Sequence, residues 1–468
     1  MMVRCAMRAG RAALMAVCVA VATTGSATAQ ERQDTLAAAV DSLAERLRAL
    51  ELELARQQAQ LQADAEERMR AEERAAVEGR GRQPDPRMRA VSGIYGRPFV
   101  WRGSGAAVGG YVDLEYQHAV DEDEGPRQFI AHRMIPFIFA EITDRIHFGT
   151  ELEFEYGGEE IKVEFAALDV AFADALAFRG GLLLSPLGKF NLIHDSPVND
   201  LTRRPLVDQQ IIPTTLTEAG LGLFGSFYPS EQSVLTYEAY VTNGFHDGLA
   251  RTDGALRSSP RIRSGRGNLR TDNNDGKALV GRLGFSPFLG LELGLSGHTG
   301  VYSVEGVTVE YTDDEGITGP VMFDGEERAS IFALDGIVTR GPFELLGEAS
   351  LAAVDLPAVA PTAPPIQPDV PDAIDQLGYY LQGNVHFGHG LVGLFPSSLF
   401  TAVARWDAID FDTDAEGDDA SRLSLGLNWR PVEETVFKLS WERDWTTARL
   451  TDDSEKGDAI WFSLASYF

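Results

Sequence analysis

The sequence predicts an all-β protein: a transmembrane antiparallel β-barrel of about 16 strands, preceded by an α-helical coiled coil. Three observations predict this fold class. Apolar and polar residues alternate with a period of two from about residue 107 to the end. The connections between these alternating segments are short and long in turn. A heptad pattern of apolar residues stands upstream of them.

Charge limits the class of partner. The 468 residues include 70 acidic and 41 basic side chains, a formal net charge of −29. A surface this acidic repels polyphosphates, and no Lys/Arg-rich segment is interleaved with aromatic residues. We therefore expect no nucleic-acid partner.

Residues 1–29 have the three parts of a secretory signal peptide. Arg4, Arg8 and Arg11 are basic, residues 12–22 are apolar, and Ala27-Thr28-Ala29 fits a small-x-small cleavage site. The apolar run is too short for a membrane-spanning helix. Both cysteines lie in this segment, so a mature chain cut after Ala29 has no disulfide, and closure of a sheet into a barrel would hold it together instead.

A coiled coil is predicted within residues 30–78. Apolar residues recur in alternating steps of four and three, with Val40, Leu47, Leu54 and Leu61 at a positions and Leu36, Leu43 and Leu50 at d positions. The alternative is an amphipathic helix packed on its own chain, which usually has a wider apolar stripe. The Gly- and Pro-containing segment 79–86 ends any helix, and we interpret residues 79–106 as a linker.

The barrel is predicted over residues 107–468. Sixteen candidate strands, with an uncertainty of about two, are expected near residues 108–118, 129–142, 146–156, 160–172, 176–185, 217–228, 232–243, 277–286, 290–301, 328–339, 342–353, 376–387, 398–408, 420–430, 435–445 and 458–468. The long connections 186–216, 244–276, 302–327 and 354–375 alternate with tight turns. A soluble sheet also alternates in polarity, but it does not require alternating loop lengths.

Aromatic residues gather near the ends of the expected strands. Trp429, Trp441, Trp445, Trp461 and Tyr467 stand where the interfacial girdles of a membrane barrel belong.

The stretch from Gly180 to Gly225, GGLLLSPLGKFNLIHDSPVNDLTRRPLVDQQIIPTTLTEAGLGLFG, together with the final strand ending in Phe468, resembles the trimeric outer-membrane porins, and within them the phosphate-selective porin-like group. The resemblance implies a homotrimer and a C-terminal Phe468 that the barrel-assembly machinery reads as a signal. Ser466 departs from the pattern, since an aromatic residue is more usual there. Some members of the group also carry an N-terminal coiled coil.

The connection 186–216 is the candidate pore constriction. In the porins that this chain resembles, this loop folds into the lumen and narrows it. Its residues Leu192, Ile193, Val198, Leu206, Val207, Ile211 and Ile212 are too apolar for a solvated tip. The polar set expected at the constriction is Lys189, Asn191, His194, Asp195, Asn199, Asp200, Arg203, Arg204 and Asp208. The alternative is that these residues form only turns and salt bridges within the loop.

The connection 244–276 reverses the sign of charge locally and is the candidate vestibule. It carries Arg251, Arg257, Arg261, Arg263, Arg266 and Arg270. A basic funnel would concentrate anions, whereas the alternative is pairing with acidic loops or lipopolysaccharide phosphates. Strand residues expected to face the lumen are of both signs: Arg133, Arg179, Arg282 and Arg405 against Asp113, Glu115, Glu151, Glu153 and Glu155.

Signals for catalysis or metal binding are poor. No H-E-x-x-H motif occurs, and Gly294-Leu295-Ser296-Gly297-His298 misses the nucleophile elbow by its last residue. Asp412, Asp414, Glu416 and Gly417 imitate the opening of a calcium loop, but Leu423 stands where the bidentate Glu belongs. We expect a solvated acidic loop there, no enzyme activity, no cofactor and no metal.

Two functions remain open. The first is an outer-membrane porin, a water-filled channel for passive diffusion of small hydrophilic solutes or ions, with anions such as phosphate as one candidate class. The second is a non-conducting outer-membrane barrel that acts as receptor, adhesin or envelope tether. In both, the barrel contacts outer-membrane lipid and lipopolysaccharide, and the coiled coil lies in the periplasm.

Overall fold

The computed structural model describes residues 101–102, 106–120, 127–252, 255–256, 260–303, 305–312, 316–323, 325–356, 359–361, 372–446 and 457–468. The chain divides into two compact units, Met1–Gly81 and Arg82–Phe468, and every described residue belongs to the second. The predicted signal peptide and coiled coil, and most of the predicted linker, lie outside the described residues.

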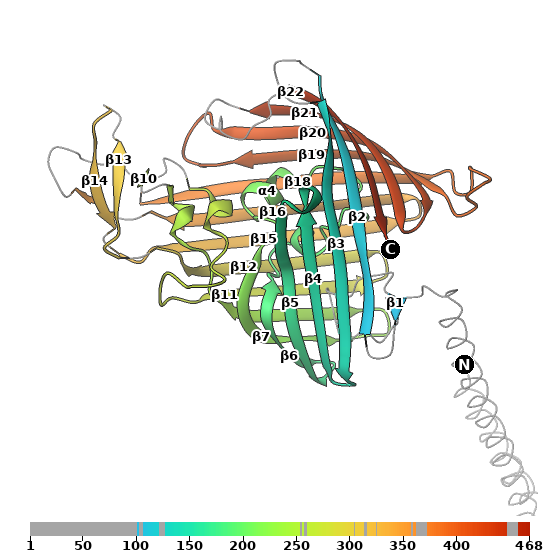
Figure 1. Ribbon diagram of the computed structural model, residues 1–468, viewed down its shortest axis with the longest axis horizontal. Helices are drawn as coiled ribbons and strands as arrows, with labels where there is room; N and C mark the ends of the chain where they lie inside the picture. Colours follow the sequence, from blue (N-terminus) through green and yellow to red (C-terminus); the bar gives the residue numbers. More distant parts are fainter. Residues whose placement is uncertain are drawn as a thin grey trace, which may run out of the picture. The chain divides into compact units, whose positions relative to one another are not determined.

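A closed antiparallel barrel of 16 strands is formed by the described part of the chain (Figure 1). The strands are β2 (Ala106–Ala119), β3 (Arg127–Thr143), β4 (Ile146–Glu155), β5 (Glu160–Ala173), β6 (Leu176–Leu184), β7 (Thr217–Phe227), β8 (Val234–Thr242), β11 (Ala278–Phe288), β12 (Leu291–Val301), β15 (Arg328–Arg340), β16 (Phe343–Asp355), β18 (Ala373–Phe387), β19 (Leu399–Asp410), β20 (Asp419–Val432), β21 (Thr435–Thr446) and β22 (Gly457–Tyr467). This confirms the predicted strands and their number.

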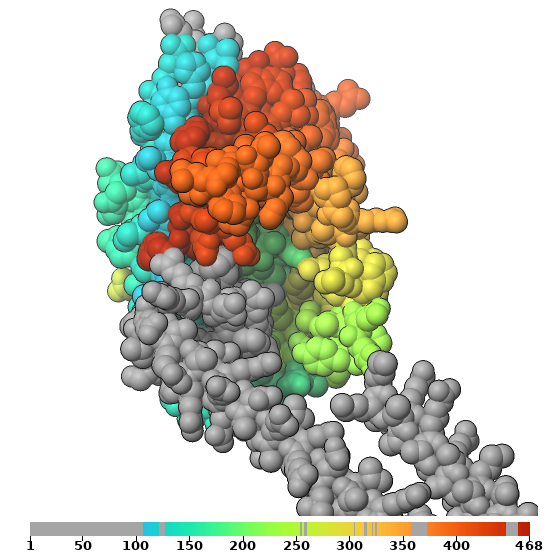
Figure 2. All heavy atoms as spheres, turned by 90° about the vertical axis from the view of Figure 1, so that its right-hand side faces the viewer, coloured from blue at the N-terminus to red at the C-terminus, as the bar shows by residue number. Residues whose placement is uncertain are grey.

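Pairing of the first and last barrel strands closes the ring. In β2 and β22, Tyr111 lies opposite Tyr467 and Ala119 opposite Ala459. Figure 2 shows these two ends of the barrel, blue and red, side by side. A two-residue strand, β1 (Trp101–Arg102), pairs with Ala107 and Val108 of β2, beyond the end of the β2–β22 ladder.

The barrel is apolar outside and polar inside, the reverse of a soluble protein. On β16 the outward Leu351 is 55% exposed, whereas the inward Glu348 is 2% exposed. The same alternation places Leu425 outside and Ser424 inside on β20. The alternation of apolar and polar residues along each strand thus produces an apolar outer surface, compatible with lipid, around a charged interior.

Aromatic rings line one end of the outer surface across five neighbouring strands. Ring centroids are 5.8 Å apart for Phe387–Phe400, 6.5 Å for Phe400–Trp429, 5.2 Å for Trp429–Phe437 and 6.4 Å for Phe437–Phe462. Two of the predicted girdle residues are not on this surface: Trp461 and Tyr467 are only 6% and 5% exposed. They lie on the inward face of β22 because that strand places its odd-numbered residues inside.

The strand connections are short at one end of the barrel and longer at the other, as predicted. One exception at the short end is the connection 388–398 between β18 and β19. At the other end, three long connections share a second sheet, seen beyond the barrel strands in Figure 1. It consists of β9 (Arg251–Thr252), β10 (Ala255–Leu256), β13 (Thr308–Thr312), β14 (Thr318–Phe323) and β17 (Val359–Pro361).

Helices in the described residues are short. They are α4 (Leu206–Gln210) and the 3-10 turns η2 (Tyr156–Gly158), η3 (Phe190–Leu192), η4 (Asp247–Leu249) and η5 (Ile262–Gly265). Within the described residues, none of the helices has the length and apolar character required to cross a membrane.

Close approach of strands at Gly222 yields a prediction about barrel stability. A Cβ at Gly222 on β7 would overlap the carbonyl oxygen of Ala239 and lie 2.7 Å from the Tyr240 Cα. We expect Gly222→Ala to lower the free energy of unfolding by about 1–3 kcal/mol, measured by urea unfolding of the refolded chain in detergent. Gly383→Ala is the matched control, because a Cβ there meets no described atom within 4 Å. Equal urea midpoints for the two variants would contradict this reading of the β7–β8 packing.

Candidate functional site

The connection between β6 and β7 folds into the barrel and divides its lumen. It contains η3 and α4, and Figure 1 shows α4 inside the ring of strands. Of the predicted apolar set, Leu192, Leu206, Val207, Ile211 and Ile212 are buried. Ile193 and Val198 are exposed instead, at 36% and 48%. We refer to residues 185–216 as the inward loop.

Glycines on the wall make room for the inward loop. A Cβ at Gly378 on β18 would lie 3.0 Å from a Val207 methyl and 3.1 Å from a methyl of Ile211. A Cβ at Gly426 on β20 would lie 2.8 Å from a methyl of Leu201. The absence of side chains at these two lumen-side positions lets α4 and its approach pack directly on the strands.

Wall side chains accept hydrogen bonds from backbone N–H groups of the inward loop. Glu348 Oε2 accepts from the N–H groups of Lys189 and Phe190 at 2.9 and 3.1 Å. Asp407 Oδ1 accepts from the N–H of Leu206 at 3.1 Å. These carboxylates come from β16 and β19, so the loop is held at two separate points along its length.

Cationic and amide side chains of the wall donate to backbone carbonyls of the same loop. The bonds are Lys438 Nζ to Ser196 O at 2.8 Å, Arg430 Nη1 to Pro197 O at 2.8 Å, Asn428 Nδ2 to Asp200 O at 2.8 Å and Arg405 Nη2 to Arg203 O at 3.0 Å. The loop therefore has a fixed course, because its backbone N–H groups and its backbone carbonyl groups both find hydrogen-bond partners on the barrel wall.

Five of the nine predicted constriction residues hold the loop in place without lining its cavity. Asn191 bridges the two ends of the loop by donating to Ser185 O and accepting from the Leu216 N–H, both at 2.8 Å. The other four are Lys189 paired with Glu292, Asp195 accepting from the Tyr467 hydroxyl at 2.8 Å, Asp200 accepting from Asn384 Nδ2 at 2.8 Å, and the buried Asp208. The Asn191 contacts lie within the loop, as the alternative expected, whereas the contacts of Lys189, Asp195 and Asp200 reach the barrel wall.

The other four line a cavity of about 370 Å³ between the inward loop and the wall. They are His194, Asn199, Arg203 and Arg204. The inward loop also contributes Gln209 and Gln210. The side chains that join from elsewhere include Glu115, His132, Arg133, Glu155, Tyr156, Arg263, Lys438 and Trp461. The sequence had placed Glu115, Arg133 and Glu155 in the lumen, but His132, Lys438 and Trp461 were not among the predicted site residues.

Arginines of the inward loop form a positive edge of the cavity. Arg203 pairs with Asp444 at 3.2 Å, and its guanidinium lies 5.7 Å from the Trp461 ring centroid. Arg204 Nη1 donates to Thr214 O at 2.6 Å, and Arg263 Nη1 donates to the same oxygen at 2.9 Å. Burial and the neighbouring charges of Arg133 and Arg263 lower the pKa of Arg204 to about 10, so it stays protonated at neutral pH.

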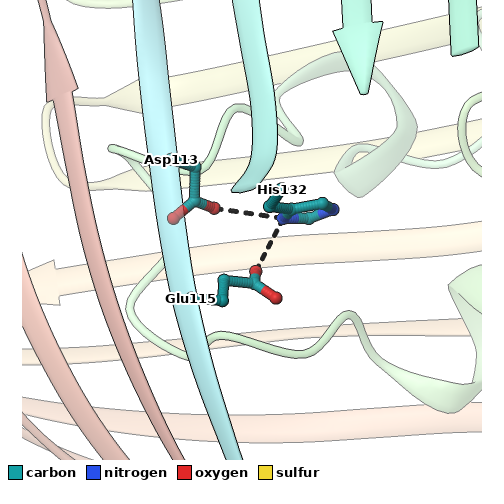
Figure 3. A group of neighbouring side chains, drawn as sticks. All are labelled: Asp113, Glu115 and His132. Carbon is teal, nitrogen blue, oxygen red and sulfur yellow. Dashed lines mark hydrogen bonds and ion pairs between the residues drawn. The ribbon is translucent and has the colours of Figure 1, made fainter. Parts of the chain in front are cut away.

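On the barrel wall, the cavity-lining His132 stands between two carboxylates (Figure 3). His132 Nδ1 is 2.7 Å from Glu115 Oε1 and 3.3 Å from Asp113 Oδ2. A β-bulge in β3 turns both His132 and Arg133 toward the lumen, and Arg133 Nη2 is 2.7 Å from His132 Nε2. The three side chains have metal-ligand chemistry, but the charges of Arg133 and of Lys438 in the same cavity already balance the carboxylates.

The predicted vestibule arginines do not share one environment. Arg263 lines the same cavity as Arg203, and Arg266 Nη1 donates to Thr215 O of the inward loop at 2.9 Å. Arg251 pairs with Asp247 at 2.5 Å, and Arg270 is exposed. Arg261 donates its backbone N–H to Leu249 O, and Arg257 lies outside the described residues. The segment 260–268 thus packs on the inward loop, which the sequence had treated as a separate region.

Comparison with known proteins places few limits on function. No protein-family model matches the chain. A curated protein of Aquifex aeolicus, described as uncharacterized, is 33% identical over 200 residues, which are 41% of this chain and 43% of that protein. The chain therefore spans less than half the length of the curated relative that it matches.

Solved structures that resemble the chain include outer-membrane proteins. OmpT of Vibrio cholerae, in a trimer form, is 11% identical with a TM-score of 0.48, and the outer membrane channel DcaP of Acinetobacter baumannii is 12% identical with the same score; the alignment covers 78% of this chain and 99% of each. The anion-selective porin from Comamonas acidovorans is 10% identical, with a TM-score of 0.45 and the same coverage. At these scores, the fold assignment rests on the strand pairing described above.

Asp208 gives a pH-dependent prediction. It is fully buried on α4, and its Oδ2 accepts no hydrogen bond in the described part of the chain. Burial, together with the negative charge of Glu348, raises the pKa of Asp208 above its ordinary value. The folded state therefore holds a proton that the unfolded chain releases above about pH 4, so stability falls as the pH rises from there through the raised pKa.

Asp208→Asn should remove this decline. We expect a gain of about 1 kcal/mol in the free energy of unfolding at neutral pH, shrinking to nothing as the pH falls to about 4. Urea unfolding of the refolded chain across that range measures it. Asp200→Asn is the control in the same loop: it removes the ion pair with Arg430 and should destabilise at neutral pH. Parallel pH profiles for Asp208→Asn and the unchanged chain would refute the assignment.

Proposed function

We propose that this chain forms a water-filled channel in a bacterial outer membrane, through which small hydrophilic solutes or ions diffuse passively. The observation that carries the proposal is the inward loop, which narrows an apolar-outside, polar-inside barrel and borders a charged cavity of about 370 Å³. That volume matches small solutes. Charged side chains gathered beside a constriction are the arrangement by which channels select their solutes.

Anions are the solute class that we propose the constriction favours. Among the charged side chains that line the cavity, five are cationic (Arg133, Arg203, Arg204, Arg263 and Lys438) and two are carboxylates (Glu115 and Glu155). This local excess of positive charge contrasts with the net charge of −29 of the whole chain. A narrow passage is governed by the charges that border it, which is why we place selectivity here. Phosphate and small carboxylates are both within this class.

The alternative is a non-conducting outer-membrane barrel that serves as receptor, adhesin or envelope tether. It shares the apolar outer surface and differs in the lumen. Single-channel recording in a planar bilayer separates the two: discrete conductance steps support the channel, and their absence from correctly folded, inserted protein supports the alternative.

Further features belong to this proposal. We infer a signal peptide over residues 1–29, a periplasmic coiled coil over 30–78, assembly as a homotrimer, and contact with outer-membrane lipid and lipopolysaccharide. We also infer that Phe468 directs assembly of the barrel. Its backbone N–H donates to Gly110 O at 2.9 Å, which supports a role for the last residue in the seam between β22 and β2.

Exchange of the cavity arginines tests anion preference. Replacing Arg203 and Arg204 by Glu should move the reversal potential in a salt gradient toward cations. A unit charge about 4 Å from a passing ion contributes about 1 kcal/mol even in water, or about a fivefold change in ion preference. The same exchange at Arg251 and Arg270, which do not line the cavity, is the control, because salt screens exposed charges within about 10 Å.

Three results bear on this test. A large shift from the first pair and a small one from the second support the constriction. Arg204→Gln alone should give a smaller shift of the same sign, and it preserves the ion pair of Arg203 with Asp444. Equal shifts from both pairs, or none from Arg203 and Arg204 in a conducting protein, would remove the inward loop as the selective element.

The coiled coil is tested by its d positions. Replacing Leu43 and Leu50 by Asp should weaken association of the N-terminal segments, because charges at d positions disrupt knobs-into-holes packing. Cross-linking through that segment measures the loss, while heat-modifiable migration in a denaturing gel reports whether the barrel remains folded. Unchanged cross-linking would show that these leucines do not join subunits.

A further inference from the structure

One connection at the short-turn end of the barrel is long and has almost no charge. It comprises residues 388–398 between β18 and β19, and its sequence, GHGLVGLFPSS, contains no Asp, Glu, Lys or Arg. Surface connections are usually polar. The connection is nonetheless compact, because the N–H of Gly390 donates to Ser398 O and the N–H of Phe395 donates to Val392 O, both at 2.8 Å.

The leucines of this connection point away from the protein. Leu391 is 72% exposed and Leu394 is 82% exposed. The turns of the two preceding hairpins at this end add Leu289, which is fully exposed, and Phe343, which is also exposed. We refer to Leu289, Phe343, Leu391 and Leu394 as the apolar rim. Contiguous apolar surface of this kind marks a site of contact with a protein or a membrane.

Backbone hydrogen bonds make the apolar rim continuous from hairpin to hairpin. The N–H of Thr339 donates to Gly290 O at 2.7 Å and joins the β11–β12 turn to β15. The N–H of His386 donates to Pro342 O at 2.8 Å and joins the β15–β16 turn to β18. The other described turns at this end carry charged residues, namely Asp144, Arg145, Asp174, Glu231, Glu433 and Glu434.

The connection packs against the outer surface of the barrel. The Phe395 ring lies edge-to-face on the Trp429 ring, with centroids 5.6 Å apart, and Trp429 belongs to the row of aromatic rings on that surface. A Cβ at Gly388 would lie 3.2 Å from the ring of Phe400, another member of the row, and 3.6 Å from a Leu391 methyl. The connection therefore extends the apolar outer surface beyond the aromatic row.

We propose that the apolar rim inserts into the lipid leaflet at the short-turn end, with Leu391 and Leu394 at the boundary between headgroups and acyl chains. Aromatic rows mark this boundary in membrane barrels, and the connection packs directly on such a row. Apolar side chains gain free energy by entering the boundary layer, and a segment without Asp, Glu, Lys or Arg brings little charge into it.

Lipid fits this surface better than a protein partner does. Fluid acyl chains adapt to single protruding side chains, whereas a protein interface requires a complementary, close-packed surface. The apolar rim would thus anchor one sector of the barrel, from β11 to β19, more deeply than the sectors with charged turns. This inference rests on the membrane location in the proposed function and is independent of whether the barrel conducts.

Depth-dependent quenching of a label at Leu394 tests the insertion. Cys5 and Cys18 are the only cysteines, and both lie in the inferred signal peptide, so an exported Leu394→Cys chain carries one thiol. A bimane label on it, in phosphatidylcholine vesicles, should emit at shorter wavelength than in water. Lipids brominated near the headgroup end of the acyl chain should quench it most, because an interfacial anchor reaches only about 5–10 Å into the leaflet.

Two further labelled positions serve as controls. Asp144→Cys lies in a charged turn at the same end, and aqueous iodide should quench its label while brominated lipid does not. Leu351→Cys lies on the outward face of β16, and bromine near the end of the acyl chain should quench its label most.

The pattern of quenching separates the possible results. If the Leu394 label behaves like the Asp144 label while the Leu351 label responds to lipid, the apolar rim is in water and the inference is wrong. Protection of the Leu394 label from both quenchers would contradict it in favour of a protein cover, such as a second copy of the chain. Failure of lipid to quench the Leu351 label would overturn the membrane location itself.

The role of the leucines is tested from a neighbouring position. A Cβ at the exposed Gly393 meets no described atom within 4 Å, so we expect Gly393→Cys to be tolerated. Its label should lose quenching by brominated lipid and gain quenching by iodide when Leu391 and Leu394 are both replaced by Ser, because the apolar anchors are gone. Ser397→Ala, an exposed change in the same connection, should alter neither. Unaltered quenching after the leucine exchange would show that these side chains do not hold the connection in lipid.

Discussion

The hydrogen-bonding demand of the inward loop is the constraint on which the rest of the lumen depends. A chain segment that leaves the barrel wall and enters its interior gives up pairing with neighbouring strands, so its N–H and C=O groups need other partners. Glu348 and Asp407 provide acceptors, while Arg405 and Lys438 provide donors. The same side chains contribute to the charge of the lumen. The groups that support the loop therefore also determine the electrostatics of the lumen.

Barrel closure determines which side chains can take part. A closed antiparallel ring leaves no free edge, and its period of two assigns each strand residue to lipid or lumen. The β-bulge between β2 and β3 breaks this rule at one point, which brings His132 and Arg133 to the lumen together. Acidic Glu115 and Glu155 line the same cavity as Arg203 and Arg204.

Much of this architecture could be predicted because it depends on local pattern. Alternation and turn spacing were enough to locate all sixteen barrel strands, and apolar residues in a long loop indicated that the loop turns inward. Side-chain partners across the lumen could not be predicted, because they depend on the stagger of strands far apart in sequence. Asn191 and Asp195 therefore looked like constriction residues, although one bridges the ends of the loop and the other binds Tyr467.

Other differences have the same origin. Arg263 was expected away from Arg203, but packing of Ile262 against Leu249 in the core carries its segment onto the inward loop. Trp461 was expected in an outer girdle, but the register of β22 turns it to the cavity.

The small sheet formed by β9, β10, β13, β14 and β17 links connections that leave the barrel at three different places. Main-chain pairing across these connections makes them a single mechanical element, so a displacement of one is transmitted to the others. Substitutions that lengthen one connection must preserve the pairing of its neighbours, which restricts how independently these surface segments can diversify. The conformation of β13 therefore depends on all three connections.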